Sequence, residues 1–148
     1  MNKLIAVAVA ATMMIASGNA LAGETQAPEG ASVYFVNLND GDTVASPVKV
    51  IFGLTGMGVA PAGVEWDGTG HHHLFINRPP FGEGELGADE TIYNIPADDN
   101  HMHFGGGQTE TVLELSPGTH TLQLVLGDQN HIPHIDPVVS EVISITVQ

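Results

Sequence analysis

Hydrophobic and polar residues alternate along most of the chain after residue 31. Large apolar residues recur at every second position in two stretches, as Val48, Val50, Phe52 and Leu54 and as Leu122, Leu124 and Leu126. A β-strand projects successive side chains to opposite faces, so this period indicates half-buried strands. Residues 138–148, the longest stretch after residue 31 without Gly or Pro, also alternate instead of repeating every 3.6 residues.

These runs predict about seven strands, with turns rich in Gly, Pro, Asn and Asp between them. The predicted strands are residues 32–38, 46–55, 72–77, 90–94, 108–115, 118–127 and 138–147. Short strands with turn signals between them, and no helical period, indicate two packed sheets. The sequence therefore predicts an all-β fold, an immunoglobulin-like antiparallel β-sandwich.

The N-terminal 22 residues have the pattern of a secretory signal peptide. A positive start that contains Lys3 precedes an apolar run from Leu4 to Ile15, and Ala20-Leu21-Ala22 supplies a small-x-small cleavage motif. The apolar run is too short to span the roughly 30 Å hydrocarbon core of a bilayer. We expect a periplasmic or secreted protein with no membrane attachment after cleavage. The expected organisation is a signal peptide over residues 1–22, a disordered lead over 23–31 and a β-sandwich domain over 32–148.

The chain is strongly acidic and contains no cysteine. It has seventeen Asp or Glu residues and three Lys or Arg residues, which gives a formal charge of −14. Binding of nucleic acid or of anionic lipid depends on clustered Lys and Arg, so neither is expected as a partner. The lack of cysteine excludes disulfides, a thiolate nucleophile, cysteine-ligated zinc and iron–sulfur clusters.

Eight histidines are the feature of the composition that points to chemistry. If successive strands run in opposite directions, the loops after the second, fourth and sixth predicted strands open at the same end of the sandwich. Residues 71–73 enter the third strand at that end. Two histidine pairs fall in the other two loops: His101 with His103, and His131 with His134. His120 lies at the opposite end, where we expect a hydrogen-bonded histidine at the edge of the core.

Imidazole is the commonest metal-binding side chain and suits copper(II) and zinc. Residues i and i+2 of an extended segment project to one side, so His71 and His73 can act as a pair, whereas His72 projects away. His101 and His103 have the same spacing. The sequence predicts a transition-metal site, copper or zinc, at one end of the sandwich. The expected ligands are His71, His73, His101, His103, His131 and His134.

Other interpretations of the histidines stay open. They can order loop backbones in a structural or protein-interaction module, or charge together below about pH 6.5 as a pH-responsive surface. Nearby aspartates can also ligate a metal or orient the imidazoles, namely Asp98, Asp99, Asp128 and Asp136. An enzyme would need a metal with an open coordination position, and the chain has no Gly-x-Ser-x-Gly motif. We therefore expect an exported, non-catalytic binding domain, with the structural or interaction module as the alternative.

Several longer motifs, taken in order, resemble one known family. They are Gly56–Val64, Thr69–Leu74, Pro96–Asp98, His101–Glu110, Pro117–Leu124, Gly127-Asp128, His131–His134 and Pro137-Val138. Over residues 32–148 the chain is similar to the secreted bacterial domain family of unknown function number four thousand three hundred and ninety-nine. The resemblance implies a small exported domain and supplies no activity and no catalytic residue. The segment Arg78–Tyr93 is longer than its counterpart in that family.

Overall fold

A computed structural model describes residues 25–148, and the predicted signal peptide lies outside the described residues. Nine strands and one four-residue helix occur in the described part of the chain. In order they are β1 (Ser32–Phe35), β2 (Thr43–Val44), β3 (Val48–Thr55), β4 (Gly58–Val59), β5 (Thr69–Ile76), α1 (Gly87–Glu90), β6 (His101–His103), β7 (Glu110–Leu113), β8 (Gly118–Gly127) and β9 (Ile143–Val147).

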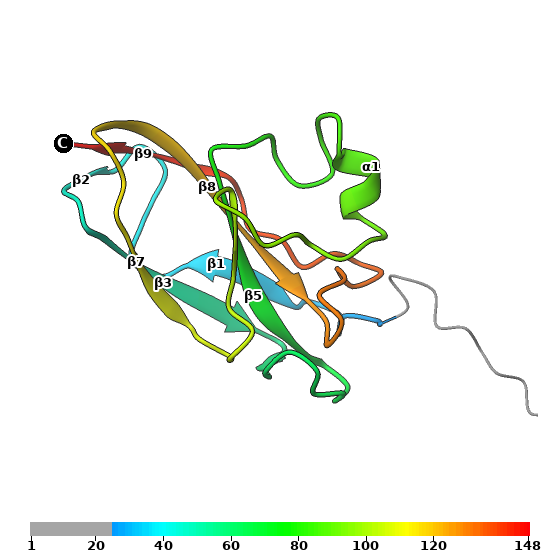
Figure 1. Cartoon of the computed structure of the whole chain (residues 1–148). Coiled ribbons are helices and arrows are strands. Elements are labelled where there is room, and N and C mark those ends of the chain that lie inside the picture. The colour runs from blue at the N-terminus through cyan, green and yellow to red at the C-terminus, as the bar shows by residue number, and fades with distance from the viewer. Residues whose placement is uncertain (1–24) are drawn as a thin grey trace, which may run out of the picture.

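The strands form two sheets with an apolar core between them (Figure 1). The smaller sheet has the order β1-β3-β7, and all its pairs are antiparallel. The larger sheet has the order β2-β9-β8-β5-β4, and β6 also pairs with β5. Two short pairs at its edges, β2 with β9 and β4 with β5, are parallel. The predicted all-β sandwich of mainly antiparallel strands is confirmed.

Strand β5 shows how the alternation of side chains creates two different environments. Leu74 and Ile76 belong to the core between the sheets, and His72, on the same side of the strand, packs on Phe52 of β3 with ring centroids 5.1 Å apart. The side chains of opposite parity point to the outer face of the larger sheet. They are His71, His73 and Phe75.

A second, smaller apolar cluster covers part of this outer face. Phe75 of β5 and Val125 of β8 pack with Ile95, and Phe81 and Val139 pack against this group. Residues 77–100, which join β5 to β6, therefore lie on the outer face of the sheet. The segment covers the part of β5 around Phe75. The beginning of the strand has other neighbours.

The predicted strand at residues 90–94 is wrong. Helix α1 ends at Glu90, and the chain continues in turns. Ile92 and Tyr93 are 45% and 58% exposed, so no sheet buries them. Glu90 instead turns inward to contact Arg78. The chain forms the short strand β6 further on, paired with β5, so His101 and His103 lie on a strand and not in a loop.

The described part of the predicted lead contacts the body of the domain. The backbone N–H of Ile135 donates to the Thr25 carbonyl at 3.0 Å, and Ala27 is buried in the core. Composition does not reveal these contacts, because they join segments more than a hundred residues apart. In residues 25–148 the helix α1 is far too short to cross a membrane.

Candidate metal centre

Four histidines meet on the outer face of the larger sheet, where β5 begins and β6 and β8 end. His73 is paired with His103 of β6, and on its other side β8 places Gly127 opposite His71. His131 comes from the loop after β8. Each of the four rings offers one nitrogen, and these nitrogens lie within 4.8 Å of one another. The four-histidine cluster consists of His71, His73, His103 and His131.

The cluster follows from strand geometry and from two close approaches of the backbone. Alternation in β5 places His71 and His73 on the same face, and the antiparallel register places His103 beside them. A Cβ atom at Gly127 would lie 2.9 Å from His73 Nε2, and one at Gly105 would lie 2.3 Å from His103 Cε1. Glycine at both positions leaves room for the imidazole rings.

The loop after β8 holds His131 in an uncommon backbone conformation. Its φ is 65°, in the left-handed region, which His adopts more readily than most residues. The Asp128 Oδ1 atom accepts hydrogen bonds from the backbone N–H groups of Asn130 and Ile132, at 2.8 and 3.0 Å. The N–H of His131 donates to the Asp128 carbonyl at 3.0 Å. Asp128 thus holds the turn that brings His131 to the cluster.

The nitrogen contacts within the cluster cannot all be full hydrogen bonds. His71 Nε2 lies 3.0 Å from His131 Nδ1 and 3.1 Å from His73 Nε2. A neutral imidazole nitrogen has either one hydrogen or one lone pair in the ring plane, so it serves only one such partner well. A cation between the rings would instead accept one lone pair from each of them.

Burial keeps the inner imidazoles neutral. His71 and His73 are fully buried, His131 is half-buried and His103 is exposed. Desolvation, followed by the neighbouring His131 and His103, lowers the pKa of His71 to about 4. Desolvation and then the neighbouring His71 lower the pKa of His73 to about 2. Burial followed by His131 also lowers the pKa of His103. Neutral imidazoles have the free lone pairs that metal binding needs.

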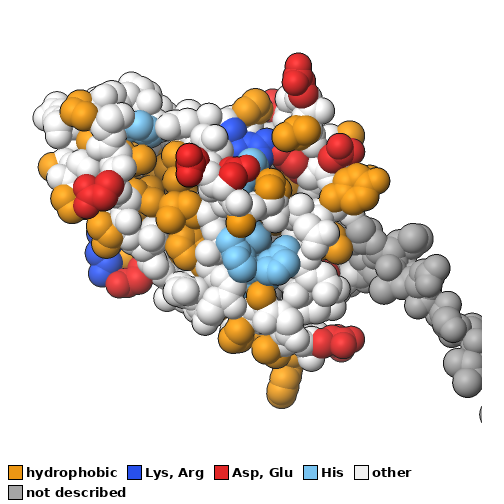
Figure 2. All heavy atoms as spheres, in the orientation of Figure 1, with side chains coloured by type: hydrophobic (Ala, Val, Ile, Leu, Met, Phe, Trp, Pro, Cys, Tyr) orange, Lys and Arg blue, Asp and Glu red, His pale blue; other side chains and the backbone are white. Residues whose placement is uncertain are grey.

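The cluster is open to solvent on one side. Figure 2 shows histidine surface gathered in a patch on one face of the molecule, and His103 and His131 are the accessible members of the cluster. An ion can therefore reach the buried nitrogens of His71 and His73 from the side where the two accessible rings lie.

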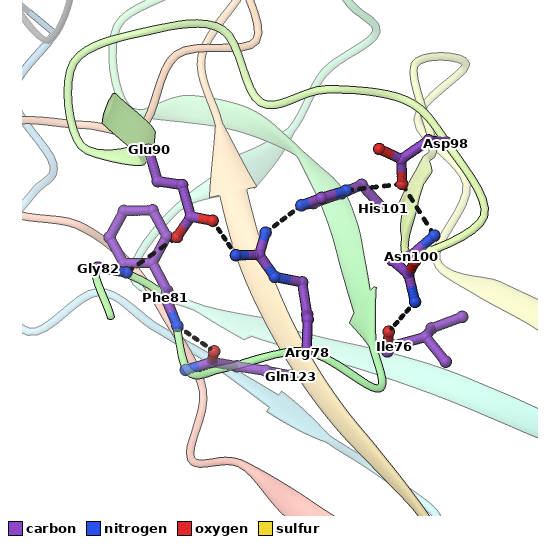
Figure 3. Close-up of polar contacts among 9 residues, drawn as sticks. All are labelled: Ile76, Arg78, Phe81, Gly82, Glu90, Asp98, Asn100, His101 and Gln123. Carbon is purple, nitrogen blue, oxygen red and sulfur yellow. Dashed lines mark hydrogen bonds and ion pairs between the residues drawn. The ribbon is translucent and has the colours of Figure 1, made fainter. Parts of the chain in front are cut away.

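His101 lies outside the cluster although it faces the same side as His103. It is paired with Phe75, two positions along β5 from His73, and its ring packs edge-on against Phe75. Its Nδ1 is 2.7 Å from Asp98 Oδ1, and its Nε2 contacts Arg78, which also pairs with Glu90 (Figure 3). Both ring nitrogens have partners from the chain itself, so this predicted ligand is not brought to the other four.

His134 is also placed elsewhere, against the N-terminal segment. Its Nδ1 lies 3.0 Å from Thr25 Oγ1, which donates its own hydrogen to Asp128 Oδ2. The structure therefore brings together four of the six predicted ligands and separates His101 and His134 from them.

The remaining histidines have the positions expected from strand parity. His120 is buried at the core edge, with Nδ1 2.9 Å from Asn77 Nδ2 and Nε2 2.9 Å from the Ser116 carbonyl. His72 is fully buried in the core, and neither of its ring nitrogens has a hydrogen-bond partner. Desolvation lowers its pKa to about 4, and the backbone of Gln108 offsets this only in part.

Fold and site together define a β-sandwich domain with a partly buried cluster of four histidines that could hold a metal ion. The chain belongs to the family described as Domain of unknown function (DUF4399), whose model matches residues 50–148. All four cluster histidines fall within the matched residues, and the predicted family resemblance is confirmed. No curated protein and no solved structure matches the chain.

Proposed function

We propose that this protein is an exported, non-catalytic domain that binds one transition-metal ion, copper or zinc. The proposed ligands are His71, His73, His103 and His131. The observation that carries the proposal is the approach of four imidazole nitrogens, from two strands and one loop, to within 4.8 Å of one another. Two of these nitrogens belong to fully buried rings, where side chains of this polarity normally have firm partners.

The donor set suits these metals better than other common ions. Four imidazoles favour zinc or copper(II), whereas calcium and magnesium prefer oxygen ligands. Zinc–nitrogen bonds of about 2.0–2.1 Å in a tetrahedron place the nitrogens about 3.3 Å apart. Two nitrogen pairs of the cluster are at 3.0 and 3.1 Å, and all lie within 4.8 Å, so ring movements of about 1.5 Å or less give this spacing. Four protein ligands fill a tetrahedral shell, which favours binding over catalysis.

Export is supported by the N-terminal sequence. Lys3, the apolar run after it and Ala20-Leu21-Ala22 have the order of a cleaved signal peptide. N-terminal sequencing of the protein recovered from a bacterial periplasm should read from Gly23. Recovery of the uncleaved chain from the cytoplasm would contradict export and leave metal binding untouched.

Calorimetric titration tests metal binding directly. After chelator treatment, the wild-type protein should bind Zn(II) and Cu(II) with one ion per chain. His103→Gln removes an exposed ligand with little risk to the fold. It should weaken binding about 100-fold, since one of four ligands supplies roughly a quarter of the 10–16 kcal/mol typical of structural zinc.

The matched control is His120→Gln, which changes another histidine at the far part of β8. This variant should bind both ions as the wild type does. Binding that is absent in the wild-type protein, or equal in His103→Gln, contradicts the proposed site.

The alternative, a structural or interaction module, is favoured by the histidines outside the cluster. His101 and His120 each use both ring nitrogens within the chain, and His134 uses one. If the wild-type protein binds neither metal, ordering of loops becomes the better account of all eight histidines.

A further inference from the structure

Asp128 is a buried acid that no cation of the described chain neutralises. It is 3% exposed and directly follows Gly127, the residue paired with His71. The fixed cations of residues 25–148 are Lys49 and Arg78, and their ion pairs are with Glu110 and Glu90. No ion pair of this range includes Asp128.

A buried charge without an opposite charge costs free energy, even where hydrogen bonds reduce that cost. The Asp128 carboxylate accepts three: Oδ1 from the N–H groups of Asn130 and Ile132, and Oδ2 from the Thr25 hydroxyl. These bonds fix the loop but leave the negative charge in place. A cation close to the carboxylate would offset the remaining cost of burying its charge.

The charge acts on the four-histidine cluster. The Asp128 carboxylate works to raise the pKa of His71, against the larger effects of burial and of the neighbouring imidazoles. The four cluster histidines are neutral ligands, so a dication bound to them alone would keep both of its positive charges. Asp128 is the acid placed to balance part of that charge.

We infer that Asp128 is the charge partner and a positioning residue of the metal site, and that it makes the site selective for divalent over monovalent cations. The inference rests on the proposed function. The carboxylate holds His131 through the loop and attracts the bound ion through its charge. Because Coulomb attraction scales with the charge of the ion, its removal should weaken a dication about twice as much, on a logarithmic scale, as a monocation.

Asp128→Asn separates the two roles, since its amide oxygen can still accept both loop hydrogen bonds while the charge is lost. Loss of a residue that supports metal ligands typically costs 10–100-fold in affinity. We expect about 100-fold weaker binding of Zn(II). For Ag(I), a redox-inert monovalent probe that also binds imidazole, we expect about 10-fold.

Asp128→Glu keeps the charge but displaces the loop bonds, so it should weaken Zn(II) and Ag(I) by the same factor. Thr25→Val removes the hydroxyl that donates to Asp128 and keeps the charge, so Zn(II) binding should stay within about threefold of wild type. Both variants are titrated beside the wild-type protein, and their folding is checked by circular dichroism.

The outcomes separate the inference from the proposed function. A wild-type protein that binds no Zn(II) overturns both. Wild-type binding with unchanged Zn(II) affinity in Asp128→Asn overturns the inference alone. Equal weakening of Zn(II) and Ag(I) in that variant also overturns it, because equal loss would mean that Asp128 acts on the loop and not through its charge.

Discussion

The strand pair β5–β6 carries two histidine regions that differ in how their nitrogens are satisfied. At one position His103 lies beside His73, in a group made only of imidazoles. Two residues away His101 lies beside Phe75, between the carboxylate of Asp98 and the guanidinium of Arg78. The same face of the same strands thus holds one region with complementary partners and one without.

The difference shows that a histidine on this face is not by itself evidence for a metal, and that the partners of its ring nitrogens decide. In the network of Asp98, His101, Arg78 and Glu90, every charged group faces an opposite charge or a hydrogen-bond partner, although Arg78 Nε is buried without one. In the four-histidine cluster, His71 Nε2 faces two nitrogens of the same kind. A cation bound as proposed would give the cluster the partner that it lacks, whereas the charges of the network are paired within the chain.

Acid should have the largest effect, and it should act through the buried imidazoles. His71, His72 and His73 have folded-state pKa values of about 4, 4 and 2, below the ordinary 6.5. The unfolded state therefore binds more protons below pH 6.5, and stability falls as the pH falls from there toward the folded pKa values. From pH 7 to pH 5 the metal-free protein should lose about 5 kcal/mol of unfolding free energy.

Denaturant unfolding across that pH range measures this loss. The double variant His71→Gln plus His73→Gln is the control, and its stability should depend less steeply on pH. An identical slope in the two proteins would show that acid acts elsewhere.

Breaking the network should destabilise the fold. It should leave metal binding unchanged. Arg78→Met leaves Glu90 buried without its cation, which typically costs about 3–5 kcal/mol. Adding Glu90→Gln removes the unpaired charge and should restore part of the stability. Urea unfolding measures both effects, and Zn(II) affinity at a temperature where the variants are folded should match wild type. A large loss of Zn(II) affinity would mean that the network and the four-histidine cluster are energetically coupled.

Most of the fold could be predicted because alternation is a local property of the sequence. Residues 118–127 form β8 with the predicted bounds, and β3 and β9 lie within their predicted ranges. The strand at 90–94 failed because the pattern does not reveal that Arg78 draws Glu90 inward. The three-residue β6 has too short a pattern to signal a strand.

The site could be predicted in part for the same reason. Alternation correctly paired His71 with His73 and turned His72 toward the core. It treated His101 and His103 as equals, but the register, which is set by contacts distant in sequence, places one beside Phe75 and the other beside His73. His134 was separated by its contact with Thr25, a residue of the segment expected to be disordered.

Metal should stabilise the protein through the cluster and not through the network. At a free Zn(II) concentration of 100 times Kd, linkage predicts about 2.7 kcal/mol of added unfolding free energy. His101→Gln should keep this increment, even if its metal-free stability is lower, whereas His73→Gln should lose most of it. Unfolding with Zn(II) and with chelator measures the increment for each variant. Loss of this increment in His101→Gln would mean that the ion binds at the network and not at the cluster.

The smallest effect on stability, with a clear effect on binding, is expected at Gly105. A Cβ atom there would lie 2.3 Å from Cε1 of His103, the exposed end of a side chain that can turn away. Gly105→Ala should therefore change unfolding free energy by no more than about 0.5 kcal/mol, as surface substitutions usually do. The displaced ring should no longer reach the other three, so Zn(II) affinity should fall about 100-fold, as expected for His103→Gln. Gly58→Ala is the control, because its Cβ would meet Thr69 at an ordinary 3.4 Å. Equal Zn(II) affinity in the two variants would mean that His103 is not a ligand, and that the other three rings hold the ion.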